Sequence, residues 1–297
     1  MLGRGGAGSH RRAAAFPIGN DLEEWMGRRR IDPAAASDPA ADPRFVTALA
    51  RGLELLRCYR PTDRWLAHQE LARRTGLPSA TVSRLTFTLS AAGYLKHRPS
   101  TGEYALAPGV LSLGFSMLTN FDIGRLARPY MEALAEHTQS AISLGVRHEA
   151  SMVYVAHCRG TARLILGLDV GTRIPLAVTA MGRAMWSAST AGMREMISRR
   201  LRAAQPAEWP ALLDGLKRAE RQVAERGYTS SESEWEREIA AVGVAIDLGD
   251  GREPLALTVG GPSSRLHGTL LHDDFAPALM NTARAIVASI QAAEWED

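Results

Sequence analysis

Five small or apolar positions between residues 72 and 85 constrain the fold of this chain more than any other feature. Ala72 is small enough to let two helices cross closely, and Gly76 stands where a tight turn needs a positive φ angle. Leu77, Val82 and Leu85 have the spacing that fills the wedge between the two helices. The pattern predicts a helix, a turn and a second helix packed across it, with an ordinary three-helix bundle as the alternative.

Apolar periodicity extends this motif in both directions. Before it, the pattern from Arg44 onward predicts a first helix that ends before Pro61, and Pro78 with Ser79 starts the helix after the turn. The following KHRPSTGEYAL segment places turn residues between two segments able to pair, which predicts a hairpin. The expected apolar faces are Phe45, Leu49, Leu53 and Leu56 in the first helix, Leu66, Leu71 and Ala72 in the second, and Val82, Leu85 and Leu89 in the third. We therefore predict a winged helix-turn-helix domain over residues 44–107.

Charge is distributed unevenly along the chain. Residues 44–107 hold ten Lys or Arg against four Asp or Glu, a net charge of +6, whereas residues 108–297 have a net charge of −3. A compact basic module on an acidic body is typical of a nucleic-acid-binding head attached to a domain of another kind. A solvated basic face is the alternative, and charge alone does not separate the two.

The outward side of the third helix carries short polar groups and one long donor, which suit the DNA major groove. We expect Arg84 to read a base, most simply guanine through its two acceptors, with a discrimination of about 1 to 3 kcal/mol. The accompanying positions are Ser79, Ala80, Thr81, Ser83 and Thr88, of which the serines and Thr81 are expected to bind phosphates. Lys96, His97 and Arg98 on the wing are expected to reach the DNA backbone or minor groove.

The remaining composition limits the class of protein. A length of 297 residues suits two domains, and no apolar run is long enough to cross a membrane. Cys58 and Cys158 are too few for a disulfide framework, which favours the cytoplasm. Residues 1–43 form an expected disordered tail and Pro-rich linker, and Met26 is a possible alternative start. The GxGxxG match at residues 3–8 follows no predicted strand, so we discard it.

Residues 122–297 give the pattern of an α+β domain. An amphipathic helix carrying Leu126, Tyr130, Leu134 and His137 precedes strand-like stretches at 139–148, 151–159 and 162–170, whose short turns predict an antiparallel meander. Helices follow at about 181–201, with a break near Thr190, and at 208–226. Strands at 239–248 and 255–260 and a helix at 275–293 complete the order. Helices on a largely antiparallel sheet make an α+β fold.

Several separated segments resemble the IclR-type bacterial transcriptional regulators. They are LAHQELARRTGLPSATVSRLTFTLSAAGYL at 66–95, YALAPGVLSLG at 104–114, VGTRIPLAVTAMGRA at 170–184 and LALTVGGPSSRL at 255–266. The resemblance implies a winged-helix head, a connecting helix at 108–121 and an effector-binding domain at 122–297. It also implies a homodimer or homotetramer that binds palindromic double-stranded DNA operators, with no cofactor.

The resemblance also places a pocket for a small organic acid at the start of the helix after Thr179. Backbone N–H groups at a helix start favour a carboxylate. The contacts carried over from the family are Leu166, Ala180, Met181, Ser231, Ala241, Thr258 and Gly260. Where well-known members have an acid, a cysteine and a serine, this chain has Ser231, Ala241 and Gly260, and Glu238 stands where glycine is common. The 170–184 segment looks most like the branch that regulates aromatic catabolism, so the resemblance implies a bulkier, less polar acid, with an aromatic acid as the candidate. Tyr154, Trp186 and Trp235 are either pocket walls or core.

Enzymatic signatures are absent from the sequence. No GxSxG, Walker or HExxH pattern occurs, and we expect no metal site. His157 and Cys158 are adjacent on a predicted strand, so their side chains point to opposite faces. His267 and His272 are five residues apart, a poor helical spacing for one metal, and we interpret them as surface residues. We predict a ligand-responsive, sequence-specific DNA-binding regulator, and a small-molecule-binding enzyme with an appended basic head is the alternative.

Overall fold

The computed structural model describes residues 42–160, 168–249 and 251–293. The chain divides into two compact units within one helix, between Val110 and Leu111, and each unit is described by itself. The expected boundary between head and connecting helix lies nearby, at residues 107 and 108. The predicted disorder of the tail, the discarded glycine motif and the alternative start at Met26 lie outside the described residues, apart from the last two positions of the tail.

The first unit has the predicted order of a winged helix-turn-helix. Its elements are α2 (Thr47–Arg57), β1 (Leu66–Ala67), α3 (His68–Thr75), α4 (Ser79–Ala91), β2 (Leu95–Arg98), β3 (Glu103–Leu106) and the start of α5 (Pro108–Thr119). The strands form a small antiparallel sheet in the order β1-β3-β2. Helix α5 extends over the range predicted for the connecting helix.

The corner between α3 and α4 is built as the spacing predicts. Gly76 ends α3 in the left-handed region at φ 65°, which a glycine adopts without steric cost. Leu71 and Val82 are fully buried, and Leu77 and Leu85 pack against the same core. The helix-turn-helix therefore rests on residues that are close together in the sequence.

Two details of the head differ from the sequence prediction. Phe45, Leu49 and Leu53 are exposed, because α2 packs through Gly52 and the fully buried Leu55 instead. A Cβ atom at Gly52 would lie 3.8 Å from Leu85, an ordinary contact distance, so this side of α2 faces α4. Leu66 is also not helical: it forms β1 and pairs with Tyr104 of β3.

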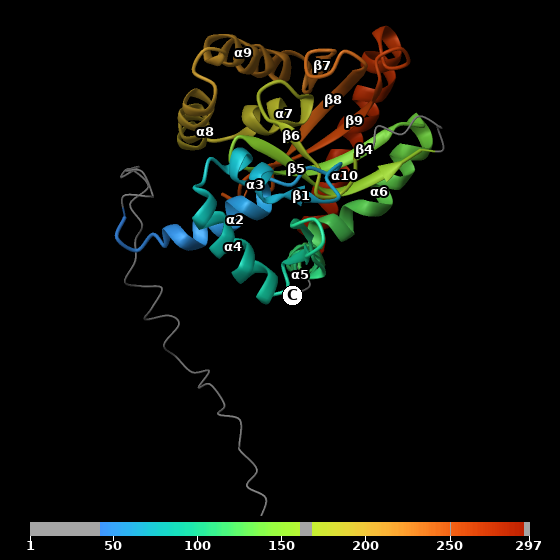
Figure 1. Cartoon of the computed structure of the whole chain (residues 1–297). Helices are drawn as coiled ribbons and strands as arrows, with labels where there is room; N and C mark the ends of the chain where they lie inside the picture. Colours follow the sequence, from blue (N-terminus) through green and yellow to red (C-terminus); the bar gives the residue numbers. More distant parts are fainter. Residues whose placement is uncertain (1–41, 161–167, 250, 294–297) are drawn as a thin grey trace, which may run out of the picture. The chain divides into compact units, whose positions relative to one another are not determined.

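The second unit is an α+β domain around one curled antiparallel sheet (Figure 1). Its six strands have the order β6-β5-β4-β9-β8-β7. The strands are β4 (Ala141–His148), β5 (Ser151–Arg159), β6 (Arg173–Pro175), β7 (Thr229–Glu232), β8 (Ile239–Ile246) and β9 (Leu255–Pro262). The helices are α6 (Asp122–Thr138), α7 (Ala180–Ala188), α8 (Ala191–Ala204), α9 (Trp209–Arg226) and α10 (Ala276–Ala293), which follows the π-helical turn η2 (Leu270–Phe275).

Most of these elements match their predicted ranges, and the differences are local. The strand that pairs with β5 is β6, later than the predicted 162–170 strand, of which residues 162–167 lie outside the described residues. Strand β7 was not predicted, because its TSSE sequence lacks an apolar alternation. The break near Thr190 is confirmed, and the Thr190 hydroxyl caps α8 by accepting the Met193 N–H at 3.3 Å.

The sheet has an apolar cluster on each face. On one face, α6 and α10 pack against β4, β8 and β9 through residues such as Met131, Ile142 and Ile286. On the other face, α7, α8 and α9 gather over Met152 and Ile174 (Figure 1). In α6 the buried stripe includes Leu134 as predicted, whereas His137 is exposed and pairs with Asp274 at 3.0 Å.

Replacing Gly76 by alanine tests the corner between α3 and α4. A Cβ atom there meets open space, so the expected loss of about 1 to 2 kcal/mol in the free energy of unfolding comes from the left-handed backbone alone. Urea unfolding of the Gly76→Ala protein measures this loss. Gly192→Ala is the matched control, because Gly192 also faces open space but lies within α8, and alanine there should not destabilise. Equal stability of wild type and Gly76→Ala would contradict the role of this turn.

Candidate functional site

Helix α4 presents the predicted DNA-contacting residues on its open side. Ser79, Ala80, Ser83, Arg84 and Thr88 are exposed, and Thr81 is half-buried. Within the described parts of the chain, the Arg84 guanidinium makes no hydrogen bond or ion pair, so its donors are available to an external acceptor. The helix thus carries one free cation among short polar side chains.

The three wing residues are not equivalent. Lys96 is exposed, and His97 stacks on Tyr104 with ring centroids 4.7 Å apart. Arg98 forms an ion pair with Glu103 at 3.1 Å and lies 3.9 Å above the Trp65 ring. Arg98 therefore holds the wing together as well as carrying charge, and Lys96 is the wing residue most open to a phosphate.

No acidic residue interrupts the stretch between Glu70 and Glu103, which contains α4 and the wing turn. Glu70 itself is engaged by Arg73 at 2.6 Å and by Arg74, and these hydrogen bonds lower its pKa to about 2. Because these arginines compensate the charge of Glu70, the exposed Arg84 and Lys96 remain available to attract phosphates.

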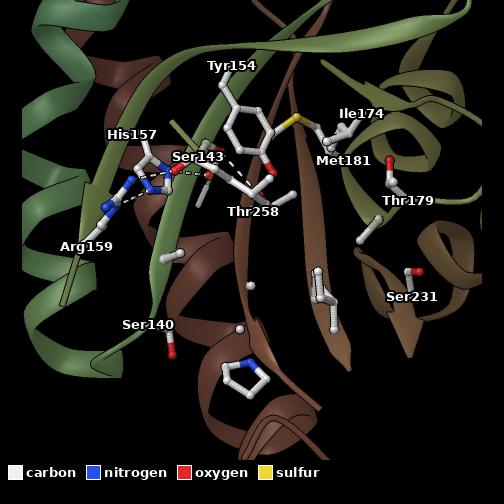
Figure 2. Close-up of a pocket in the computed structure, with 18 of the residues that line it drawn as sticks. Ser140, Ser143, Tyr154, His157, Arg159, Ile174, Thr179, Met181, Ser231 and Thr258 are labelled. Carbon is white, nitrogen blue, oxygen red and sulfur yellow. Dashed lines mark hydrogen bonds between the residues drawn. The ribbon is translucent and has the colours of Figure 1, made fainter. Parts of the chain in front are cut away.

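The second unit contains a cavity against the inner face of the sheet. Its empty space, including the part open to solvent, is about 1050 Å³. Eight of the residues expected at the effector site line it: Tyr154, Ala180, Met181, Ser231, Trp235, Ala241, Thr258 and Gly260. Figure 2 shows His157 and Arg159 on one side of this cavity and Thr179 and Ser231 on the other.

Two expected contacts stand apart from these eight. Leu166 lies outside the described residues. Trp186 is buried among α7, α8 and α9, and its indole N–H donates to Glu220 at 3.0 Å. Met181 lines the cavity, and a residue five positions later on the same helix points about 140° away, so the structure does not bring Trp186 to the cavity.

The start of α7 is held tightly against the sheet. A Cβ atom at Gly243 of β8 would lie 2.6 Å from the Ala180 carbonyl, so only glycine allows this approach. Thr179 caps the helix by accepting the Gly182 N–H at 3.2 Å, and Ser231 donates to the Val178 carbonyl at 2.9 Å. The Ala180 and Met181 residues that line the cavity are therefore fixed by backbone packing and by a cap.

A hydrogen-bonded chain of polar side chains forms one side of the cavity. The Nε of Arg159 donates to His157 Nε2 at 3.0 Å, and His157 Nδ1 lies 2.9 Å from the Ser143 hydroxyl (Figure 2). Because arginine can only donate, Nε2 must accept, so His157 is neutral with its proton on Nδ1. Burial and then the Arg159 charge lower the pKa of His157. Ser143, His157 and Arg159 are not among the effector-site residues predicted from the sequence.

A β-bulge brings these residues to the cavity. Leu144 pairs with Ala156 and Gly145 with Tyr154, so Val155 is an extra residue in β5. The alternation of β5 changes at this point: Tyr154 before the bulge and His157 after it face the same side, and their rings lie 5.9 Å apart. Cys158 points into the opposite core, as its adjacency to His157 predicts.

Two more arginines shape the cavity. Arg265 lines it and donates to the Thr138 and Gln139 carbonyls at 2.8 and 2.6 Å, at the C-terminal end of α6. Arg183 is 4% exposed and binds Glu234 with both terminal nitrogens, at 2.7 and 2.6 Å. These hydrogen bonds lower the pKa of Glu234 and anchor the residue next to Trp235 in the cavity wall.

The remaining histidines and metal ligands give no second site in the described ranges. His272 is more than a surface residue, since it lies 3.0 Å from the Tyr228 hydroxyl and 3.1 Å from Glu232. Among residues 42–160, 168–249 and 251–293, no group of three potential metal ligands occurs. In the same ranges, no helix combines the length and apolar character needed to cross a membrane.

Each of the two units matches a known protein domain family. Residues 48–99 match the IclR helix-turn-helix domain, and residues 115–288 match the C-terminal domain of the bacterial transcriptional regulator IclR. The chain belongs to the IclR family. The fold class and the family resemblance predicted from the sequence are thus confirmed.

Several IclR-family relatives cover most of the chain. The HTH-type transcriptional regulator TsaQ1/TsaQ2 of Comamonas testosteroni is 34% identical over 84% of this chain and 90% of its own length. The Pca regulon regulatory protein of Pseudomonas putida is 29% identical over 82% and 84%. These relatives are named as regulators, in agreement with a regulatory rather than an enzymatic class.

Solved IclR-family structures share the fold. An IclR family transcriptional regulator from Brucella abortus is 38% identical, has a TM-score of 0.76 and covers 87% of this chain and 97% of its own. An IclR homolog from Microbacterium hydrocarbonoxydans, complexed with 4-hydroxybenzoate, is 20% identical with a TM-score of 0.62, over 82% and 99%. The chain is therefore an IclR-type regulator with a DNA-binding and an effector-binding domain.

The neutral state of His157 predicts a pH dependence of stability. Its pKa in the folded protein lies below the ordinary 6.5, so the unfolded chain binds the proton more readily. The contribution to stability is complete above pH 6.5 and is lost as the pH falls through the folded pKa. Urea unfolding at several pH values should show a steeper loss below 6.5 for wild type than for His157→Gln. Parallel curves for the two proteins would contradict a half-buried neutral imidazole at His157.

Proposed function

We propose that this chain is a ligand-responsive, sequence-specific regulator that binds a palindromic double-stranded DNA operator in the cytoplasm. The supporting observation is α4, which presents Arg84 without a described partner from a head of net charge +6. Two heads of a dimer dock their α4 helices in successive major grooves. Ser79, Thr81 and Ser83 hold phosphates, while Arg84 contacts guanine and Lys96 the DNA backbone.

The proposed oligomer is a homodimer or homotetramer. Helix α5 has no buried residue in the single chain, and Leu111, Leu113 and Phe115 are 74%, 58% and 66% exposed. Leu49 of α2 is also 62% exposed. Apolar surface of this extent on one helix is typical of a contact with another protein surface, and a second copy of the chain is the simplest partner.

The proposed effector is a small aromatic carboxylic acid that binds in the cavity. Tyr154, Ile174 and Met181 supply apolar walls, while the Arg159–His157–Ser143 chain supplies hydrogen-bonding groups, with the Arg159 cation shared with Asp169 at 3.1 Å. The homolog that holds 4-hydroxybenzoate supports an aromatic acid as the probe to use. Of the contacts predicted from the sequence, we keep Leu166, Ala180, Met181, Tyr154, Ser231, Trp235, Ala241, Thr258 and Gly260 in the proposed site. Trp186 was also predicted, and we leave it out because it does not line the cavity.

Effector binding regulates DNA binding only through a difference in affinity. The acid shifts the equilibrium between arrangements of the two heads to the extent that it binds one arrangement better than the other. The alternative function, an enzyme with an appended basic head, predicts turnover of the acid. A protein that binds the acid and returns it unchanged, while its operator affinity changes, is a regulator.

An Arg84→Ala substitution tests the DNA-reading role. Loss of a contact with two guanine acceptors should reduce operator affinity by about 10- to 100-fold, since such contacts discriminate by about 1 to 3 kcal/mol. Binding to a scrambled duplex should change much less. Fluorescence anisotropy on both duplexes at fixed salt gives the two affinities. An Arg84→Ala protein with unchanged preference for the operator would contradict the assignment.

An Arg159→Gln substitution tests the effector site. The cation on this side of the cavity should stabilise a carboxylate, so the melting-temperature rise caused by 4-hydroxybenzoate in wild type should be lost. Trp186→Phe is the matched control, because Trp186 is buried outside the cavity and should leave the ligand-induced rise unchanged. Calorimetric titration with 4-hydroxybenzoate and benzoate gives the affinities directly. If neither acid raises the melting temperature of wild type, the aromatic-acid assignment is wrong.

A further inference from the structure

Helix α4 carries an apolar side chain that the helix-turn-helix core does not use. Phe87 is 76% exposed, a larger fraction than for any other large apolar residue in the described part of the chain. Its neighbour Thr86 is fully buried. A large aromatic ring left in water on a helix that is otherwise polar on its open side indicates a contact outside the single chain.

The position of Phe87 around α4 places it at the centre of the proposed DNA-reading face. Successive residues of an α-helix are about 100° apart, so Phe87 falls between Ser83 and Arg84 in a view down the axis. Leu85 and Leu89, which pack against the core of the head, lie on the opposite side. Along the axis, Phe87 is three residues beyond Arg84, or about 4.5 Å, which is close to the spacing of about 3.4 Å between stacked base pairs.

The charge around Phe87 favours duplex DNA over an apolar protein partner. No acidic residue occurs between Glu70 and Glu103, whereas Arg84 and Lys96 are exposed in the same stretch. Phosphate attraction would bring base edges, and not a second basic head, against this side of α4. In the major groove, the apolar group that a base edge presents is the C5-methyl group of thymine.

We propose that Phe87 is a specificity-determining residue that reads a thymine methyl group within two base pairs of the guanine contacted by Arg84. The inference rests on the proposed function, since it requires α4 in the major groove. Arg84 and Phe87 together then read two neighbouring positions by different chemistry, a charged hydrogen bond and an apolar contact. The operator half-site should therefore contain a guanine and a nearby thymine in a fixed order.

The test begins with an operator obtained from the full-length protein. Duplexes selected from a random pool by wild-type protein define the half-site, and each thymine is then replaced by uracil, which removes only the methyl group. At one thymine in each half-site, wild type should lose affinity about fourfold or more, the value expected for one buried methyl group. Phe87→Ala should lose a similar amount on the unmodified operator and nothing further on the uracil operator.

Two controls keep the result specific to the contact. Phe87→Leu keeps an apolar side chain and should retain part of the sensitivity to uracil. The melting temperature of Phe87→Ala should equal that of wild type, because the ring is 76% exposed. Equal sensitivity of wild type and Phe87→Ala to every uracil overturns the inference and leaves the proposed function standing. A Phe87→Ala protein with unchanged operator affinity and a weakened dimer also overturns the inference, because a second copy of the chain, and not DNA, would then cover the ring. If wild type enriches no sequence, the proposed function itself fails, and the inference fails with it.

Discussion

The cavity of the second unit depends on the close approach of α7 to the sheet. Gly243 lets the Ala180 carbonyl rest against β8, and the Thr179 cap fixes the direction in which the helix leaves. With that contact in place, Met181 forms one wall, and Arg183 reaches back to hold the loop of Trp235 through Glu234. A side chain at residue 243 would push α7 away from the sheet. The shape of the cavity would then change even though all of its lining residues are the same.

The head could be predicted almost completely from the sequence because its determinants are local. Leu71, Gly76 and Val82 act within a few turns of one another, so their spacing alone predicts the corner. The face of α2 could not be predicted in the same way. Its most regular apolar stripe, through Leu49 and Leu53, stays exposed, because α2 packs on the core through the side of Gly52 and Leu55 instead. Periodicity identifies a helix and does not show which of two apolar faces is covered.

The cavity could be predicted only in part. The family resemblance predicted Met181 and Thr258 as cavity residues. It did not predict His157 and Arg159, because the face of the sheet to which their side chains point depends on the register of β4 against β5. Regular alternation would have put Tyr154 and His157 on opposite faces. The available signal was the presence of two polar residues two positions apart at the end of an apolar strand. Trp186 shows the reverse error, since an aromatic residue near a pocket helix belongs to the core when the helix turns it away.

The extra residue at Val155 changes which residues of β5 face the cavity, from even-numbered to odd-numbered positions. Ahead of it, even-numbered residues face the cavity side, and beyond it odd-numbered residues do, while Ala156 and Cys158 stay in the opposite core. His157 and Arg159 can therefore be replaced by other residues in evolution without disturbing the hydrophobic core on the opposite face of the sheet. A deletion of Val155 would remove the bulge and leave these directions unchanged, because Tyr154 and His157 would then be two positions apart and would still face the cavity side. In β5, the residues that can change ligand recognition are therefore different from those that keep the domain folded.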